Sequence, residues 1–255
     1  MITIKEYTNQ VCYIEIDRPH KKNALTRSTI EKLIGFIKTS ANSTEFNVLV
    51  LSGSNGFFSA GADLSWMKEG MKQSDEENQA DAQLFNELYH EMSIYPKPII
   101  AKVERGAYGG AIGLMACSDV VITSPEALFK FSETALGLIP ATVAPYIFRK
   151  IGSGNTRYLL ISGHQFDGVD ALEYGLVHLL VTAKELEMTT RETAEKMATL
   201  GPQAVAKTKE LLNFLDQKTF IISQETKSFC ASLIADARKT EESQKRVGSF
   251  FNNQV

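Results

Sequence analysis

The sequence predicts an α/β fold, because short apolar strands alternate with helical segments over the first two thirds of the chain. The chain has 255 residues, enough for a large buried core, and its 44% hydrophobic and 22% charged residues are typical of a globular protein. Two glycine-containing loops, 57–64 and 106–113, each follow an apolar strand, which is a common arrangement in α/β proteins.

The first elements are predicted in order as a hairpin, a helix and a strand. Residues 2–7 and 11–16 are β-rich around a polar turn, so they predict a hairpin. Ser28 and Glu31 then have capping-box spacing. The apolar positions that follow recur at helical spacing: Ile30, Leu33, Ile34 and Ile37. The apolar run 47–52 predicts the next strand.

The same pattern then continues along the chain. Helical stretches are predicted from about Leu64 to Met92, followed by a strand at 98–103. A helix at 109–116 and a strand at 120–123 come next, and the chain is mostly helical from about Thr142.

One domain with a helical C-terminal segment is the simplest organisation. We see no Ser/Pro-rich linker, and Gly201–Pro202 separates two helical stretches. We therefore predict a core over residues 1–200 and a C-terminal helical segment over 201–255.

Charge and apolar patterning exclude several classes of protein. Lys plus Arg is 27 against 30 for Asp plus Glu, a net charge of −3, so the whole molecule does not attract nucleic acid or anionic membranes. No run approaches the ~20 apolar residues of a membrane span. We expect neither nucleic acid nor membrane as a partner.

A reducing compartment is indicated by the cysteines. Cys12, Cys117 and Cys230 are odd in number, far apart and without C-x-x-C spacing, so we expect reduced thiols. Residues 1–7 have neither a signal-peptide nor a transit-peptide pattern. We predict a cytoplasmic protein.

The segment 63–91 is unusually acidic, with eight acidic residues and two lysines. It is either a solvated helix face or a mobile lid over a site, and the sequence leaves both open.

The two glycine loops are the first candidates for chemistry. Small residues let a ligand approach the backbone, and the N–H groups of two such loops can form an oxyanion hole for a carbonyl oxygen that gains charge. Each loop alone is equally compatible with an ordinary turn. Neither is G-x-G-x-x-G or a P-loop, and the chain has no G-x-S-x-G elbow. The four histidines lack paired-ligand spacing, so we predict no metal.

Glu133 is the second candidate, because it follows a strand within the mostly apolar segment 129–140. Such neighbours desolvate a carboxylate and raise its pKa toward the range useful for acid/base catalysis. The alternative is a loop carboxylate paired to Lys130 or Arg149.

Several motifs together resemble the crotonase family, the enoyl-CoA hydratases and isomerases. The similarity runs in order along nearly the whole chain, through RPHKKNAL (18–25), FFSAGADL (57–64), GAYGGAIGLMACSDV (106–120), FSETALGLIP (131–140), FDGVDALEYGLV (166–177) and GPQAVAKTK (201–209). Within the family, FSAGADLSWM, ENQADAQLFNELY and ALGLIPATVAPYIFRKIG are most similar to bacterial methylglutaconyl-CoA hydratases of leucine and isovalerate degradation.

The resemblance implies a fold and an assembly. The fold would be a crotonase spiral of repeated strand-strand-helix units, with residues 201–255 as a helical region used in trimer formation. A homotrimer or homohexamer is expected.

The resemblance also implies a site. The thioester carbonyl oxygen would lie between the N–H groups of Ala60 and Gly110, and Glu133 would be the acid/base. The remaining implied substrate-binding residues are Lys22, Ala24, Gly61, Ala62 and Asp63 near coenzyme A, and Trp66, Tyr108 and Pro140 in the acyl pocket. For Trp66, helix packing is an equal alternative. Coenzyme A would be part of the substrate, and no separate cofactor is implied.

One departure from the family matters for the reaction. Many family hydratases have a second glutamate, and the matching position here is Gly113. A single glutamate is common in family isomerases, so an enoyl-CoA isomerase is the alternative to a hydratase. A third alternative is a non-catalytic scaffold or RNA-binding member. The acidic net charge and the presence of both loops and Glu133 disfavour it.

Overall fold

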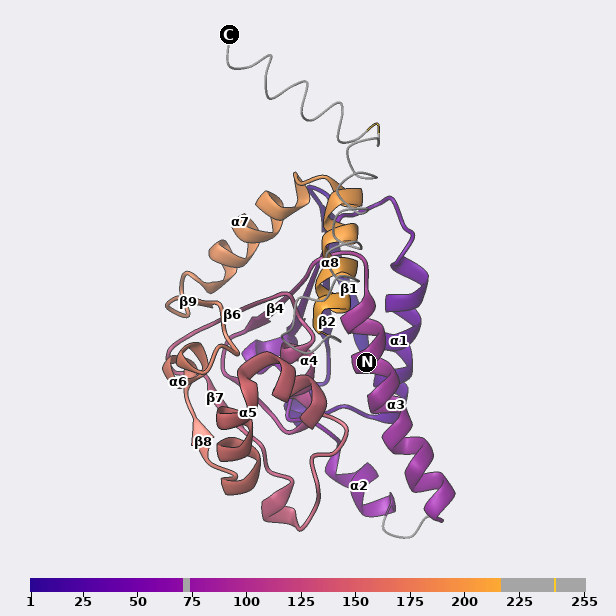
Figure 1. Cartoon of the computed structure of the whole chain (residues 1–255), viewed down its shortest axis with the longest axis vertical. Coiled ribbons are helices and arrows are strands. Elements are labelled where there is room, and N and C mark those ends of the chain that lie inside the picture. The colour runs from indigo at the N-terminus through magenta and orange to yellow at the C-terminus, as the bar shows by residue number, and fades with distance from the viewer. Residues whose placement is uncertain (71–73, 217–240, 242–255) are drawn as a thin grey trace. The chain divides into compact units, whose positions relative to one another are not determined.

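The structure is a computed structural model that describes residues 1–70, 74–216 and 241 (Figure 1). Contacts divide the chain into two compact units, Met1–Ala198 and Thr199–Val255. Of the second unit, the structure describes mainly the helix α8, Pro202–Asp216. Cys230 lies outside the described residues, and the roles predicted for the segments 1–200 and 201–255 stay predictions.

A six-stranded sheet with the order β1-β2-β3-β4-β6-β9 organises the first unit. Only β1 and β2 are antiparallel, and each later strand of this sheet adds in parallel. The strands are β1 (Ile2–Thr8), β2 (Val11–Ile16), β3 (Val48–Gly53), β4 (Ile99–Val103), β6 (Val120–Thr123) and β9 (Leu179–Leu180). The predicted hairpin and the strands predicted at 47–52, 98–103 and 120–123 are confirmed within one residue at each end.

A second, three-stranded sheet was not predicted from the sequence. It has the order β5-β7-β8, with β5 (Gly106–Tyr108) parallel to β7 (Leu128–Lys130) and β7 antiparallel to β8 (Gln165–Phe166). These strands have only two or three residues, too few for the alternating pattern by which a strand is recognised.

Helices cover both faces of the large sheet. Successive side chains of a strand point to opposite faces, so each strand contributes to the core on both sides. Cys12, Ile14 and Ile16 of β2 belong to the core with α1, α3 and α4, whereas Val11 and Tyr13 pack with α7. The helices α1 and α3 lie side by side (Figure 1). The helices of the first unit are α1 (Arg27–Ser40), α2 (Leu64–Gly70), α3 (Asp75–Ile94), α4 (Gly110–Ala116), α5 (Ala144–Ser162), α6 (Gly168–Glu173) and α7 (Leu186–Ala198).

One local prediction needs correction. The α1 cap is Thr26, whose side chain accepts from the Thr29 N–H, and not the predicted pair Ser28 and Glu31. The helical stretches predicted from about Leu64 to Met92 are confirmed as α2 and α3, and Ser74 and Glu77 make a capping box at the start of α3.

Among the described residues, no helix has the length and apolarity needed to cross a membrane. The same part of the chain contains no group of three His, Cys, Asp or Glu side chains arranged to hold a metal ion.

Candidate active site

The two glycine loops meet side by side, as an oxyanion hole requires. The Tyr108 N–H donates to the Ser59 carbonyl at 3.0 Å, and the Phe58 N–H donates to the Gly106 carbonyl at 3.1 Å. Gly61 has φ +79°, and a β-carbon there would lie 2.5 Å from the Tyr108 carbonyl oxygen. Only glycine permits this backbone conformation and this approach without strain.

The N–H groups of the first loop have different partners, and these partners show which N–H is left without an acceptor in the part of the chain that the structure describes. The Ala60 N–H donates to the Lys22 carbonyl at 2.8 Å, and the Gly61 N–H donates to Ser59 Oγ at 3.2 Å. The prediction that Ala60 is an oxyanion-hole donor therefore does not fit the structure, because its N–H already has a backbone acceptor.

Ala62 is the better donor on this loop. Leu25 pairs with Ala62 in a parallel bridge, but the bonds run from the Leu25 N–H to the Gly61 carbonyl at 2.7 Å and from the Asp63 N–H to the Leu25 carbonyl at 2.9 Å. Because successive N–H groups point to opposite sides of an extended chain, that of Ala62 points away from Leu25. Within the part of the chain that the structure describes, it has no backbone acceptor.

The second loop supplies the N–H of Gly110, the first residue of α4. The preceding Gly109 has φ 50° and ψ −129°, and its own N–H donates to the Lys130 carbonyl at 2.9 Å. The Gly110 N–H lies in the first helical turn and has no acceptor among the described residues. A β-carbon on Gly61 would lie 3.3 Å from the Gly110 nitrogen, so the two loops bring the N–H groups of Ala62 and Gly110 into one region.

Glu133 lies beside these loops, just before the short helix Thr134–Leu136. A β-carbon on Gly109 would lie 3.1 Å from Glu133 Oε1. Burial raises the pKa of Glu133, and hydrogen bonds from the backbone of Glu133 and Ser132 oppose this only in part. Oε2 is buried and accepts no hydrogen bond from any described residue, so the alternative pairing to Lys130 or Arg149 is not seen.

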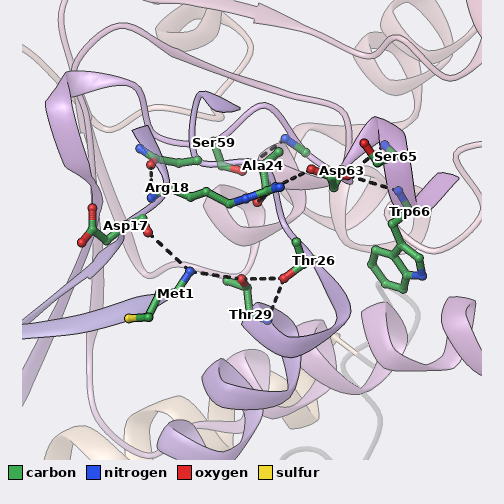
Figure 2. Close-up of polar contacts among 12 residues, drawn as sticks. Met1, Asp17, Arg18, Ala24, Thr26, Thr29, Ser59, Asp63, Ser65 and Trp66 are labelled. Atoms are coloured by element: carbon green, nitrogen blue, oxygen red, sulfur yellow. Dashed lines mark hydrogen bonds and ion pairs between the residues drawn. The ribbon is translucent and has the colours of Figure 1, made fainter. Parts of the chain in front are cut away.

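Both carboxylate oxygens of Asp63 accept hydrogen bonds from other residues of the chain (Figure 2). Its Oδ1 accepts from the N–H groups of Ser65 at 2.8 Å and Trp66 at 3.1 Å at the start of α2. Its Oδ2 accepts from Arg18 in an ion pair. Burial alone would raise the pKa of Asp63, but the hydrogen bond from Arg18 and those from the backbone outweigh it, so the pKa lies below its usual value. Asp63 therefore fixes the loop beside Ala62.

Two adjacent cavities accompany the loops. A cavity of about 570 Å³ brings together predicted residues from three segments: Lys22, Ala24, Ala60, Ala62, Asp63 and Tyr108. A cavity of about 580 Å³ contains Trp66 and is otherwise mostly apolar: Leu64, Met67, Ala82, Phe85, Leu136 and Leu138. The two share Ala62, Leu64 and Leu136 in their linings, so they adjoin at the loops. Pro140 lines neither of them.

Trp66 is a fixed part of the second cavity. Its Nε1–H donates to Asp81 Oδ2 at 2.8 Å, and its ring stacks on Phe85 with centroids 5.9 Å apart. Asp81 also forms an ion pair with Arg27 of α1. Trp66 therefore packs between α2 and α3 and also lines the second cavity, and its role in an acyl pocket stays a prediction.

Sequence reasoning missed two residues that shape the site. Asn23 is fully buried and donates to the carbonyls of Ser54 at 2.8 Å and Phe57 at 2.6 Å, so it holds the start of the first loop. Tyr89 of α3 is also fully buried, and its hydroxyl donates to the Gly110 carbonyl at 2.7 Å. Neither contact has a signal in the local sequence, because both partners lie far along the chain.

A fold of this topology, with two N–H groups and a buried carboxylate beside a cavity, defines an enzyme of the crotonase fold. The model of the family described as "Enoyl-CoA hydratase/isomerase" matches residues 6–251. The chain belongs to this family.

Relatives and solved structures agree with this membership. The short-chain-enoyl-CoA hydratase of Clostridium acetobutylicum is 31% identical over 82% of this chain and 80% of its own length. The 2,3-dehydroadipyl-CoA hydratase of Escherichia coli is 29% identical over 80% of this chain and 78% of its own. The crystal structure of an enoyl-CoA hydratase from Shewanella pealeana has a TM-score of 0.92 at 32% identity, covering 99% of this chain and 92% of that one.

Proposed function

We propose that this chain is an enoyl-CoA hydratase that adds water across the 2,3 double bond of an acyl-CoA thioester. The observation that carries the proposal is the convergence of the Ala62 and Gly110 N–H groups with the Glu133 carboxylate at the meeting point of two loops. Two donors for one oxygen beside one base are the groups that an enolate intermediate needs.

The reaction follows from these groups. The thioester carbonyl oxygen accepts hydrogen bonds from Ala62 and Gly110, which draws electrons from the conjugated double bond. Glu133 takes a proton from water as the water oxygen bonds to C3, and the carbonyl oxygen gains the negative charge of an enolate. Glu133 then returns the proton to C2, so the product is the substrate plus one water. The raised pKa of Glu133 suits a group that must both accept and return a proton.

The coenzyme A moiety is proposed to lie along the first cavity, which presents Lys21, Lys22 and Lys130. Ammonium groups attract phosphates, and here they lie next to the oxyanion donors. Coenzyme A enters as part of the substrate, so the reaction requires no separate cofactor.

The acyl group is proposed to occupy the second cavity, whose aromatic and aliphatic lining suits a branched chain. Lys68 also contributes to this lining and is an exposed cation able to meet a terminal carboxylate. These features support 3-methylglutaconyl-CoA, an intermediate of leucine and isovalerate degradation, as the substrate to test first.

The alternative is an enoyl-CoA isomerase that moves a proton between two carbons with Glu133 alone. Gly113 favours this alternative, because α4 offers no second carboxylate at that position. The two reactions differ in the mass of the product.

Mass spectrometry of the acyl-CoA product tests the proposal. Purified protein is incubated with 3-methylglutaconyl-CoA, crotonyl-CoA and a 3-enoyl-CoA. A gain of one water supports the hydratase, whereas unchanged mass with a moved double bond supports the isomerase. Glu133→Gln should remove either activity, because an amide cannot carry the proton. Glu126→Gln, in an exposed position on the same segment, is the matched control.

A cytoplasmic homotrimer or homohexamer is proposed for the assembly. The helix α5 exposes Phe148, Tyr158 and Ile161, which are large side chains of the kind buried in subunit interfaces. Size-exclusion chromatography with light scattering tests this, and a monomer would contradict it.

A further inference from the structure

Tyr89 presents a second polar side chain at the glycine loop 106–113. Its polar group is a hydroxyl, whereas that of Glu133 is a carboxylate. Its hydroxyl donates to the Gly110 carbonyl at 2.7 Å, and a β-carbon on Gly110 would lie 2.9 Å from that oxygen. The adjacent residue, Gly109, is the one that approaches Glu133 Oε1. The phenol and the carboxylate therefore contact neighbouring residues of one loop.

The space beside α4 is shaped around this tyrosine. A β-carbon on Gly113 would lie 2.6 Å from Cε1 and Cζ of Tyr89, closer than real β-carbons approach. The ring is held in place by Phe85, at 6.0 Å between centroids, and by Tyr146, at 5.3 Å. The position of the Tyr89 hydroxyl thus requires a glycine at 113. The same glycine stands where many family hydratases have their second glutamate.

The hydrogen-bonding capacity of the two groups is complementary to water. The Tyr89 proton goes to Gly110, so the hydroxyl oxygen retains lone pairs that can accept. Glu133 Oε2 is buried and has no donor among the described residues. Burial raises the pKa of Tyr89 well above its ordinary value, with smaller contributions from Cys117, Glu133 and Tyr146, so the phenol is neutral at physiological pH.

We propose that Tyr89 and Glu133 together hold the water that adds to the substrate. One water O–H points to Glu133, which takes its proton, and the other points to the Tyr89 oxygen, which accepts a hydrogen bond and no proton. The water oxygen is then left with a lone pair directed at C3. The inference rests on the hydratase function proposed above and supplies the partner that a single carboxylate lacks.

The test compares two reactions of the same protein. Hydration of crotonyl-CoA or 3-methylglutaconyl-CoA needs the bound water. Exchange of the C2 protons of butyryl-CoA with D₂O needs Glu133 and the oxyanion donors but no water addition. We expect Tyr89→Phe, which retains the ring but loses the hydrogen bond to water, to lower kcat for hydration by about 10- to 100-fold and to change the exchange rate by less than about twofold.

Tyr95→Phe is the matched control. Tyr95 ends the same helix, is equally buried, and loses a comparable hydrogen bond with Ser40 Oγ at 2.9 Å. It should change neither reaction. Gly113→Ala is the second variant, because its methyl group displaces the Tyr89 ring without removing the hydroxyl. It should reproduce the selective loss of hydration.

Each outcome decides the inference. Equal loss of hydration and exchange in Tyr89→Phe would mean that the hydroxyl acts only by holding the Gly110 peptide, and the inference would be wrong. Unchanged hydration in that variant would overturn the inference alone. A wild-type protein that exchanges butyryl-CoA but hydrates neither enoyl-CoA would overturn the hydratase function together with it.

Discussion

Replacing Gly61 by alanine tests whether the close approach of the two loops is needed for activity. Gly61 has φ +79°, and the added β-carbon would lie 2.5 Å from the Tyr108 carbonyl oxygen. An ordinary contact begins at 3.4 Å, so the loops must separate by 3.4 − 2.5, or 0.9 Å, or the atoms must clash. Either change displaces the neighbouring Ala62 N–H from the thioester carbonyl oxygen that we propose it binds.

The expected loss can be derived from this geometry. A displacement near 1 Å in a positioned group costs about 100-fold in rate, so we expect kcat to fall by about that factor. The positive φ adds about 1–2 kcal/mol of backbone strain, which lowers the Tm by about 2–8 °C for a chain of this size.

The assay is steady-state hydration of the best thioester, with thermal unfolding measured in parallel. Gly35→Ala is the control, because a β-carbon at Gly35 in α1 meets no atom within 4 Å and alanine favours a helix by about 1 kcal/mol. It should raise the Tm and leave kcat unchanged. A Gly61→Ala protein with kcat within threefold of wild type would show that the two loops do not form the oxyanion hole.

Further predictions concern the two buried carboxylates. Activity should fall as the pH falls through the raised pKa of Glu133, so the acid limb of kcat/KM should lie above pH 4.5, and a limb below that value would exclude Glu133 as the base. Because a raised pKa means that burial disfavours the charged form, Glu133→Gln should raise the Tm at pH 7 but not at a pH below that pKa, and an equal Tm change at both would refute the cause. Asp63→Ala leaves Arg18 without its buried partner, and chemical denaturation should show a loss of about 3–5 kcal/mol. The lowered pKa of Asp63 places its stabilisation above the unfolded pKa, so the difference from wild type should shrink as the pH falls toward its folded pKa, and a pH-independent difference would contradict the ion pair.

Much of the fold could be predicted because the relevant signals are local. The hairpin, β3, β4 and β6 are apolar runs bounded by turn residues, and α4 follows a glycine loop. The short strands of the second sheet could not be recognised, since two or three residues carry no periodicity. The sequence predicts the start of α1 two residues late, because Ser28 is at least as suitable an N-cap residue as Thr26. Only the observed hydrogen bond to the Thr29 N–H distinguishes them.

In the candidate site, too, the local features could be predicted, whereas those set by contacts between distant segments could not. Glu133 and the two loops could be found from composition and resemblance, but the choice between Ala60 and Ala62 depends on the partner of each N–H. That partner is set by Lys22 and Leu25, which precede the loop by more than thirty residues and run beside it. Tyr89 is missed for a related reason, because its contact with Gly110 joins two helices that are recognised separately.

The stability of the first loop is therefore part of its function. An oxyanion hole is effective because its donors are oriented before charge develops, so that no reorganisation is needed during the reaction. Ala62 is held on one side by Gly61 against Tyr108 and on the other by Asp63, whose carboxylate is fixed by Arg18 and by the start of α2. The Asp63 side chain contacts no reacting atom in the proposed mechanism, yet its loss should reduce activity through Ala62. Restoring stability elsewhere in the chain should not recover it.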